Sequence, residues 1–84
     1  MAQIIKATGE RIEVKPKNGT DFQLEELKTV VGGYIEIVRL KDGKILVVNE
    51  EGMIYNLPFN EEATDLAYRM ILGDVLYCDI NQIK

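Results

Sequence analysis

The stretch YIEIVRLKDGKILVV, residues 34–48, decides the fold. Its first part, Tyr34–Leu40, is rich in β-branched and aromatic residues, which favour a strand, and Asp42-Gly43 is a common hairpin turn. Its second part, Ile45–Val48, is apolar at every position, so both faces of that strand should be buried. The stretch therefore predicts a hairpin whose second strand is the most buried strand of the protein.

Two short strands are predicted before this hairpin. Gln3–Ala7 and Arg11–Lys15 flank Gly9, and glycine permits the positive φ that a tight reversal needs. Apolar and charged residues alternate along Arg11–Lys15, so one face of this strand should meet water. Pro16 then ends the strand, as expected at a sheet edge.

Two helices are predicted from their end signals. Thr20 and Gln23 have the spacing of a capping box, so a helix should start at Thr20 and end at Gly32 in a left-handed cap. Asn60 is a good N-cap for a second helix, which has the clearest apolar periodicity in the sequence and which Gly73 closes.

The remaining segments complete a single domain over residues 1–84. Glu51-Gly52 predicts a turn into a short strand, Met53–Tyr55, as the third strand of a meander, and Asp74–Ile80 is the final strand. The expected order is ββαβββαβ, an α+β fold with a mainly antiparallel sheet and two helices. A chain of this length has surface for only one core.

The composition excludes most catalytic chemistry. The chain contains no histidine and no serine, which removes the usual nucleophile pairs, general bases and metal ligands. Glu61 and Asp65 lie four residues apart, but acidic residues are expected in the first turn of a helix because they oppose its dipole. We therefore expect no catalytic residue, no metal site, no cofactor and no enzymatic activity.

Cys78 is the one possible thiol nucleophile. Strand alternation places it on the same face as Leu76 and Ile80, so the thiol should be buried and inert. A single cysteine cannot form an intramolecular disulfide, and no apolar leader or membrane segment is recognisable. These observations favour the cytoplasm and no membrane contact.

The charge distribution is uneven. The formal net charge is −4; residues 1–17 hold four bases and two acids, whereas residues 50–79 hold seven acids and one base. Direct nucleic-acid binding is not expected, because it needs clustered cations. The acidic half is either a solvated surface that maintains solubility or a surface that meets a basic partner.

A candidate partner-binding surface is predicted at the ends of the strands and helices, where a rigid sheet presents side chains. The alternative is structural, with the glycines needed for backbone conformation and the polar residues for caps and turns. The candidate residues are Gly32, Gly33, Tyr34, Asn49, Glu50, Asn60 and Glu61.

Four segments carry a resemblance to a known family: residues 30–36 (VVGGYIE), 49–52 (NEEG), 57–63 (LPFNEEA) and 71–76 (ILGDVL). The chain resembles small domains of unknown function found in phages, plasmids and other bacterial mobile elements. The resemblance covers about residues 24–77 and leaves the opening hairpin outside. It implies a genomic setting and carries no catalytic residues with it.

In that setting, we expect a non-enzymatic binding protein, for example a stoichiometric inhibitor of a host defence protein. One alternative is an oligomer that sequesters a small nucleotide signal, and another is a structural or regulatory accessory protein. A homodimer is also expected, because several short strands in a small chain leave sheet edges that pairing would cover.

Overall fold

A computed structural model describes residues 2–83 of the chain. It confirms the predicted α+β fold, with a mainly antiparallel sheet and two helices. The strands are β1 (Ala2–Ile5), β2 (Arg11–Val14), β3 (Ile35–Arg39), β4 (Lys44–Asn49) and β5 (Val75–Asp79). The helices are α1 (Leu24–Val31) and α2 (Glu61–Ala67), and a 3₁₀ helix, η1 (Ile80–Gln82), follows β5.

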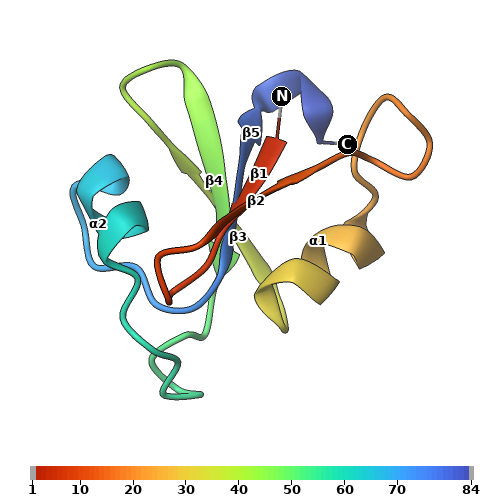
Figure 1. Cartoon of the computed structure of the whole chain (residues 1–84). Helices are drawn as coiled ribbons and strands as arrows, with labels where there is room; N and C mark the ends of the chain where they lie inside the picture. Colours follow the sequence, from red (N-terminus) through yellow and green to blue (C-terminus); the bar gives the residue numbers. More distant parts are fainter. Residues whose placement is uncertain (1, 84) are drawn as a thin grey trace.

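The five described strands form one sheet in the order β2-β1-β5-β4-β3, and all neighbouring strands are antiparallel (Figure 1). In chain order the β1-β2 and β3-β4 hairpins come first, and β5, the last strand, lies between β1 and β4. Side chains Ile45–Val48 of β4 are at most 3% exposed, which confirms that this strand is buried on both faces. β2 and β3 are left as the two edges of the sheet.

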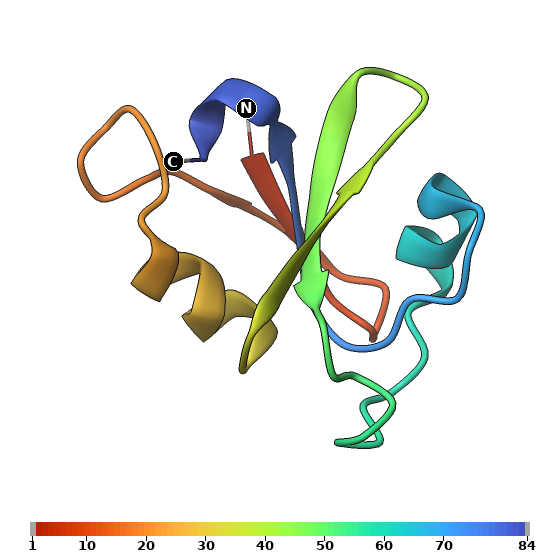
Figure 2. The same ribbon diagram turned by 180° about the vertical axis from the view of Figure 1, so that it is seen from behind.

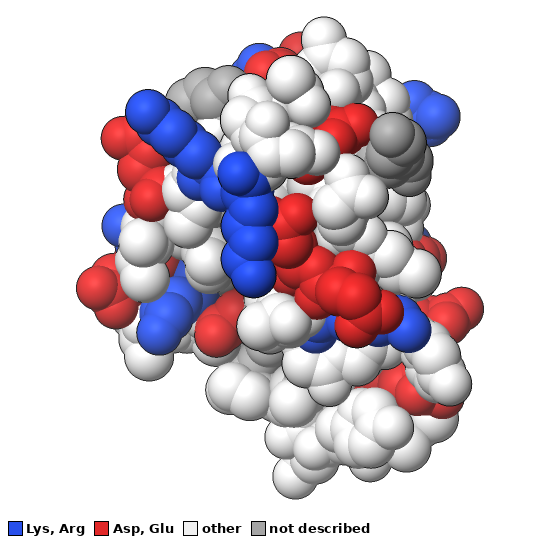
Figure 3. Space-filling view, turned by 90° about the vertical axis from the view of Figure 1, so that its right-hand side faces the viewer, with Lys and Arg blue, Asp and Glu red and all other residues white. Residues whose placement is uncertain are grey.

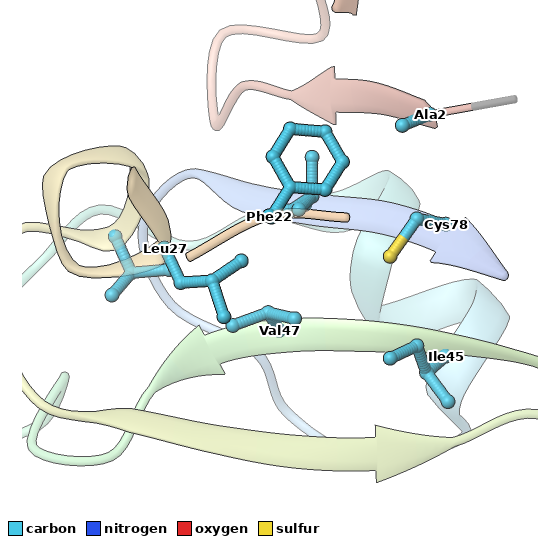
Figure 4. Packing of buried hydrophobic residues seen from close by; sticks show 8 residues of the cluster. Ala2, Phe22, Leu27, Ile45, Val47 and Cys78 are labelled. Carbon is cyan, nitrogen blue, oxygen red and sulfur yellow. The ribbon is translucent and has the colours of Figure 1, made fainter. Parts of the chain in front are cut away.

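A helix covers each face of the sheet (Figure 2). On one face, Leu27 and Val31 of α1 pack into a core that includes Val47, together with side chains from β1 and β5 (Figure 4). On the other face, Ala63 of α2 packs into a second core that includes Leu46. Because successive strand residues point to opposite faces, β4 contributes to both cores, which explains its unbroken apolar sequence.

α1 begins later than the sequence predicted. The Thr20 N–H and hydroxyl both donate to Asn18 Oδ1, at 2.9 and 3.2 Å, so Thr20 belongs to a turn and does not cap the helix. Phe22 is only 3% exposed and packs into the first core, which requires the chain to stay extended there. The N-cap is Gln23, whose N–H donates to the Glu26 carboxylate at 2.9 Å.

The predicted strand at Met53–Tyr55 is wrong. These residues lie in successive turns, in which the Tyr55 N–H donates to the Glu51 carbonyl at 3.1 Å and Asn56 adopts a left-handed φ of 54°. The neighbours of β4 are β3 and β5, so no ladder is left for a strand at this point. The order is therefore ββαββαβ.

α2 begins as predicted but ends at Ala67, well before Gly73. Tyr68 takes a left-handed φ of 57° and its N–H donates to the Thr64 carbonyl at 2.9 Å, which caps the helix. The Thr64 hydroxyl then accepts the Ile71 N–H at 2.9 Å. Ending the helix early returns Ile71 to the second core, where it is 2% exposed.

β1 and β5, the first and last strands in the chain, are also shorter than predicted. The predicted first strand ran to Ala7, but β1 ends at Ile5, because the Ala7 N–H donates to the Asp74 carboxylate at 2.9 Å and not to a strand. Asp74 itself precedes β5. At the other end of β5, Ile80 begins η1 and is not part of the strand.

Candidate functional site

Asn49, at the end of β4, connects α1 to the turn that follows the strand. Its side-chain Nδ2 donates to the Val31 carbonyl at 3.0 Å, and its Oδ1 accepts the Glu51 N–H at 2.7 Å. A Cβ atom on Gly33 would lie 3.1 Å from Asn49 Nδ2, so glycine is needed for this close approach. Gly32 caps α1 with a left-handed φ of 82°, as predicted. Both glycines and the 7% exposed Asn49 thus have structural tasks.

Tyr34 and Glu50 present their side chains to solvent beside this link. The Glu50 N–H donates to the Tyr34 carbonyl at 2.9 Å, which extends the β3-β4 pairing by one residue. The Tyr34 side chain is 60% exposed, and Lys28 Nζ lies 5.5 Å from its ring centroid. The structure therefore brings five predicted residues to one end of the sheet: Gly32, Gly33, Tyr34, Asn49 and Glu50.

The structure places the other two predicted residues with α2, on the opposite face of the sheet. Asn60 is fully buried; its Nδ2 donates to the carbonyls of Ile5 and Gly73, at 3.0 and 2.8 Å, and its Oδ1 accepts the Ala63 N–H at 3.0 Å. Glu61 is exposed in the first turn of α2. Within residues 2–83 no hydrogen bond joins either residue to the Tyr34 group, so Asn60 serves the fold and not a surface.

A loop of residues 50–57 extends from the same end of the sheet on a well-anchored base. Gly52 is buried, and a Cβ there would lie 3.2 Å from Leu72 Cβ. The Leu57 N–H closes the loop by donating to the Gly52 carbonyl at 3.0 Å. Leu57 in turn packs on Gly73, where a Cβ would lie 2.8 Å from Leu57 Cδ1. Two glycines thus let both ends of the loop lie directly on the segment before β5.

The tip of the 50–57 loop is apolar and exposed. Met53 is 79% exposed, Ile54 75% and Tyr55 56%, and nearby Met70 is 64% exposed. The loop is the lowest part of Figure 1, and the same lower end is mostly uncharged in Figure 3. Sequence reasoning missed this surface because it treated Met53–Tyr55 as a strand. The available signal was an apolar run, without alternation, between turn residues.

A hollow of about 210 Å³ lies beside the loop. Its walls are the loop, the adjoining ends of β3 and β4, and residues 69–72; Met53, Ile54 and Met70 line it. An ion pair between Arg69 Nη2 and Glu36 Oε2, at 2.9 Å, forms its polar wall. The hollow has the size of one large side chain rather than of a typical small-molecule pocket of about 300–1,000 Å³.

A family model described as a domain of unknown function (DUF3846) matches residues 1–83. The chain belongs to this family. The match extends over the opening β1-β2 hairpin, which lay outside the segments that carry the resemblance in the sequence. No curated protein and no solved structure matches the chain.

The DUF3846 chain has a second hollow, of about 300 Å³, between α1 and the β1-β2 hairpin. Lys15 and Lys17 line it, together with apolar side chains such as Phe22. The Glu26 carboxylate also lines it and accepts the Lys17 N–H at 3.0 Å. Hydrogen bonds from the backbone of Gln23 and of Lys17 lower the pKa of Glu26, so this carboxylate is charged at neutral pH. An anionic ligand would therefore meet a negative charge beside the two lysines.

Reactive groups in the described part of this DUF3846 chain are few. Cys78 is fully buried, as predicted, and burial raises the pKa of its thiol to about 11. The thiol is therefore uncharged and shielded at neutral pH. Residues 2–83 contain no group of three acidic or cysteine side chains that could hold a metal ion. Across the same residues, no helix is long and apolar enough to cross a membrane.

Proposed function

We propose that this DUF3846 chain is a non-enzymatic protein-binding domain whose partner contacts the 50–57 loop and the hollow beside it. The observation that carries the proposal is the exposure of Met53, Ile54 and Tyr55 on an anchored loop. Methionine and tyrosine are enriched at the centres of protein interfaces, and large apolar groups clustered in water are otherwise uncommon on small proteins. A rigid base reduces the ordering that binding would require.

The charge around the loop indicates the chemistry of the partner. Residues 50–74 hold six acids and one base, and that base, Arg69, is paired with Glu36. Glu50 is exposed at the start of the loop. A partner with an apolar side chain for the hollow and basic residues around it would complement this surface.

A protein partner is favoured over a nucleotide signal by the two hollows. The hollow beside the loop has an acidic residue in its polar wall, and the second hollow places the Glu26 carboxylate beside Lys15 and Lys17. Neither provides the uncompensated cations that phosphate groups need. In the mobile-element setting that the sequence resemblance implies, the partner would be a host protein that the domain inhibits by forming a stoichiometric complex.

The test compares three proteins as baits in a bacterial lysate: wild type, Ile54→Asp and Leu24→Asp. Leu24 is the matched control, because it is a 51% exposed apolar residue on α1, away from the loop. A protein that wild type and Leu24→Asp retain but Ile54→Asp loses is then purified and titrated. We expect Ile54→Asp to weaken its binding by about 30-fold or more, as for a central interface residue, with an unchanged melting temperature.

Two results would contradict the proposal. One is equal binding of the purified partner by wild type and Ile54→Asp. The other is a thermal shift of the wild-type protein by cyclic or phosphorylated nucleotides, together with no protein partner, which would favour the sequestering alternative.

A further inference from the structure

Within residues 2–83, the outer edge of β3 presents backbone groups that no other strand pairs. At the two ends of the β3-β4 hairpin, the Leu40 N–H donates to the Lys44 carbonyl at 2.9 Å and the Glu50 N–H donates to the Tyr34 carbonyl at 2.9 Å. In an antiparallel pair, hydrogen-bonded residues alternate with residues whose N–H and C=O point away. Even-numbered residues of β3 therefore bond to β4, and the odd-numbered ones, Ile35, Ile37 and Arg39, point their backbone groups outward.

Within residues 2–83, β4 is the sole strand neighbour of β3. Figure 2 shows β3 as the strand nearest the viewer, at the end of the sheet. Two of the residues whose backbone groups point outward are apolar: Ile35, which is half-buried, and Ile37, which is 37% exposed. An unpaired strand with apolar side chains is a template for a further strand.

We propose that β3 pairs with β3 of a second copy in an antiparallel, twofold arrangement centred on Ile37. In this register Ile37 faces its own equivalent, Ile35 faces Arg39, and Glu36 faces Val38. Every residue of β3 has a partner, and no two like charges are opposite each other. The two sheets become one continuous sheet across the twofold axis.

The charge pattern of β3 selects this register over its neighbours. Centring the pair on Glu36 would place two carboxylates in the close, non-hydrogen-bonded position, and centring it on Arg39 would oppose two guanidinium groups. Centring it on Val38 removes the like charges but leaves Ile35 and Glu36 without a β3 partner. The register centred on Ile37 is thus the longest one without repulsion, which is why a second copy of this chain is the occupant we assign.

The arrangement leaves the 50–57 loops free. Each loop is at the end of the sheet where β3 begins, and antiparallel pairing places the two beginnings of β3 at opposite ends of the interface. The dimer therefore does not depend on the proposed partner, and its failure would leave that proposal unaffected.

Disulfide trapping tests the register directly. Facing residues of a hydrogen-bonded antiparallel pair have Cα atoms about 5.5 Å apart, within the range of a disulfide. Ile37→Cys should therefore form a covalent dimer under mild oxidation. Glu13→Cys, at the centre of the other edge strand, is the matched control. The buried thiol of Cys78 needs no replacement in either variant.

We expect light scattering of the wild-type protein to give about twice the 9.5 kDa mass of one chain. Ile37→Lys and Ile37→Glu should each raise the dimer dissociation constant by about tenfold or more, and an equimolar mixture of the two should recover the dimer. A monomeric wild type at high micromolar concentration overturns the proposal, as does trapping of Glu13→Cys as readily as Ile37→Cys. If the charged variants do not fold, the disulfide-trapping result is the deciding test.

Discussion

The two edge strands of the sheet carry the same number of charged residues but place them differently. β2 holds Arg11 and Glu13, and β3 holds Glu36 and Arg39. Just before β2, the Glu10 carbonyl accepts the Lys6 N–H at 2.8 Å. Even-numbered residues of β2 therefore bond to β1, and the two charged residues, which are odd-numbered, point their backbone groups outward.

This difference sets how long a stretch of each edge can pair with a second copy without opposing like charges. Antiparallel self-pairing of β2 centred on Glu13 would oppose two glutamates and would place Arg11 opposite Lys15. Centring it on Ile12 would oppose no like charges but would pair only residues 11–13 of β2. Self-pairing of β3 centred on Ile37 opposes no like charges and pairs the whole strand. The position of a charge along an edge strand, rather than the number of charges, thus determines which registers of self-pairing the edge allows.

Proline substitution on β3 should have the largest effect, because proline removes a backbone N–H. It also tests the assigned alternation of β3 directly. Glu36→Pro removes an N–H that bonds to β4 and should destabilise the fold by about 3 kcal/mol. Ile37→Pro removes an outward N–H and should cost clearly less, as for prolines on edge strands, while abolishing the dimer. Urea unfolding and light scattering of both variants give the two results.

The same pair of substitutions on β2 is the control. Ile12→Pro should destabilise the fold like Glu36→Pro, because its N–H faces β1, and Glu13→Pro should resemble Ile37→Pro in stability without changing the oligomeric state. Equal losses of stability at positions 36 and 37 would show that the assigned alternation of β3 is incorrect.

One buried asparagine supports each edge, and these two residues should give the next largest effects. Asn60 bonds to the Ile5 carbonyl of β1, the neighbour of β2, whereas Asn49 ends β4, the neighbour of β3. Asn60→Ala removes hydrogen bonds to two buried carbonyls and a helix cap, so it should cost about 3 kcal/mol. Asn49→Ala leaves one carbonyl and one N–H unpaired and should cost about 2 kcal/mol.

Thermal and urea unfolding measure both changes, with the exposed Asn81→Ala as a control that should stay within about 0.5 kcal/mol of wild type. A cost for Asn49→Ala as small as that of the control would mean that its hydrogen bonds to Val31 and Glu51 do not hold the β3 side of the sheet.

The parts of the fold that depend on residues close together in sequence were predictable from the sequence. The Asp42-Gly43 turn, the doubly buried β4, the N-cap at Asn60 and the left-handed cap at Gly32 are all confirmed. Contacts distant in sequence contribute to the errors. Thr20 could not be recognised as a turn residue without knowing that Phe22 packs into the core.

The candidate site was predictable in part for the same reason. Gly33, Tyr34, Asn49 and Glu50 meet because the register of the β3-β4 hairpin, a local feature, brings them together. The position of Asn60 depends on the insertion of β5 between β1 and β4, which no local pattern encodes. The exposed loop depends on it too, because β5 takes the place that a strand at residues 53–55 would have needed.

Tyr77, on the central strand β5, connects the two edges and should give the smallest effect. Its hydroxyl donates to the Asp42 carboxylate in the β3-β4 turn at 2.7 Å, and Arg11 of β2 lies 5.7 Å from its ring centroid. The bond to Asp42 raises the pKa of Tyr77 above its ordinary 10.0, and the bond from Tyr77 lowers the pKa of Asp42 below its ordinary 3.8.

The sign of each shift sets where Tyr77→Phe differs from wild type. The raised pKa of Tyr77 adds stability that is complete below pH 10.0 and is lost as the pH rises through the folded value. The lowered pKa of Asp42 adds stability that is complete above pH 3.8 and is lost as the pH falls through the folded value. The wild-type advantage over Tyr77→Phe should therefore be constant near neutrality and should shrink at both extremes. Urea unfolding of both proteins from pH 3 to pH 11 measures it, and an advantage that stays constant over this whole range would show that the hydroxyl does not join the β3-β4 turn to β5.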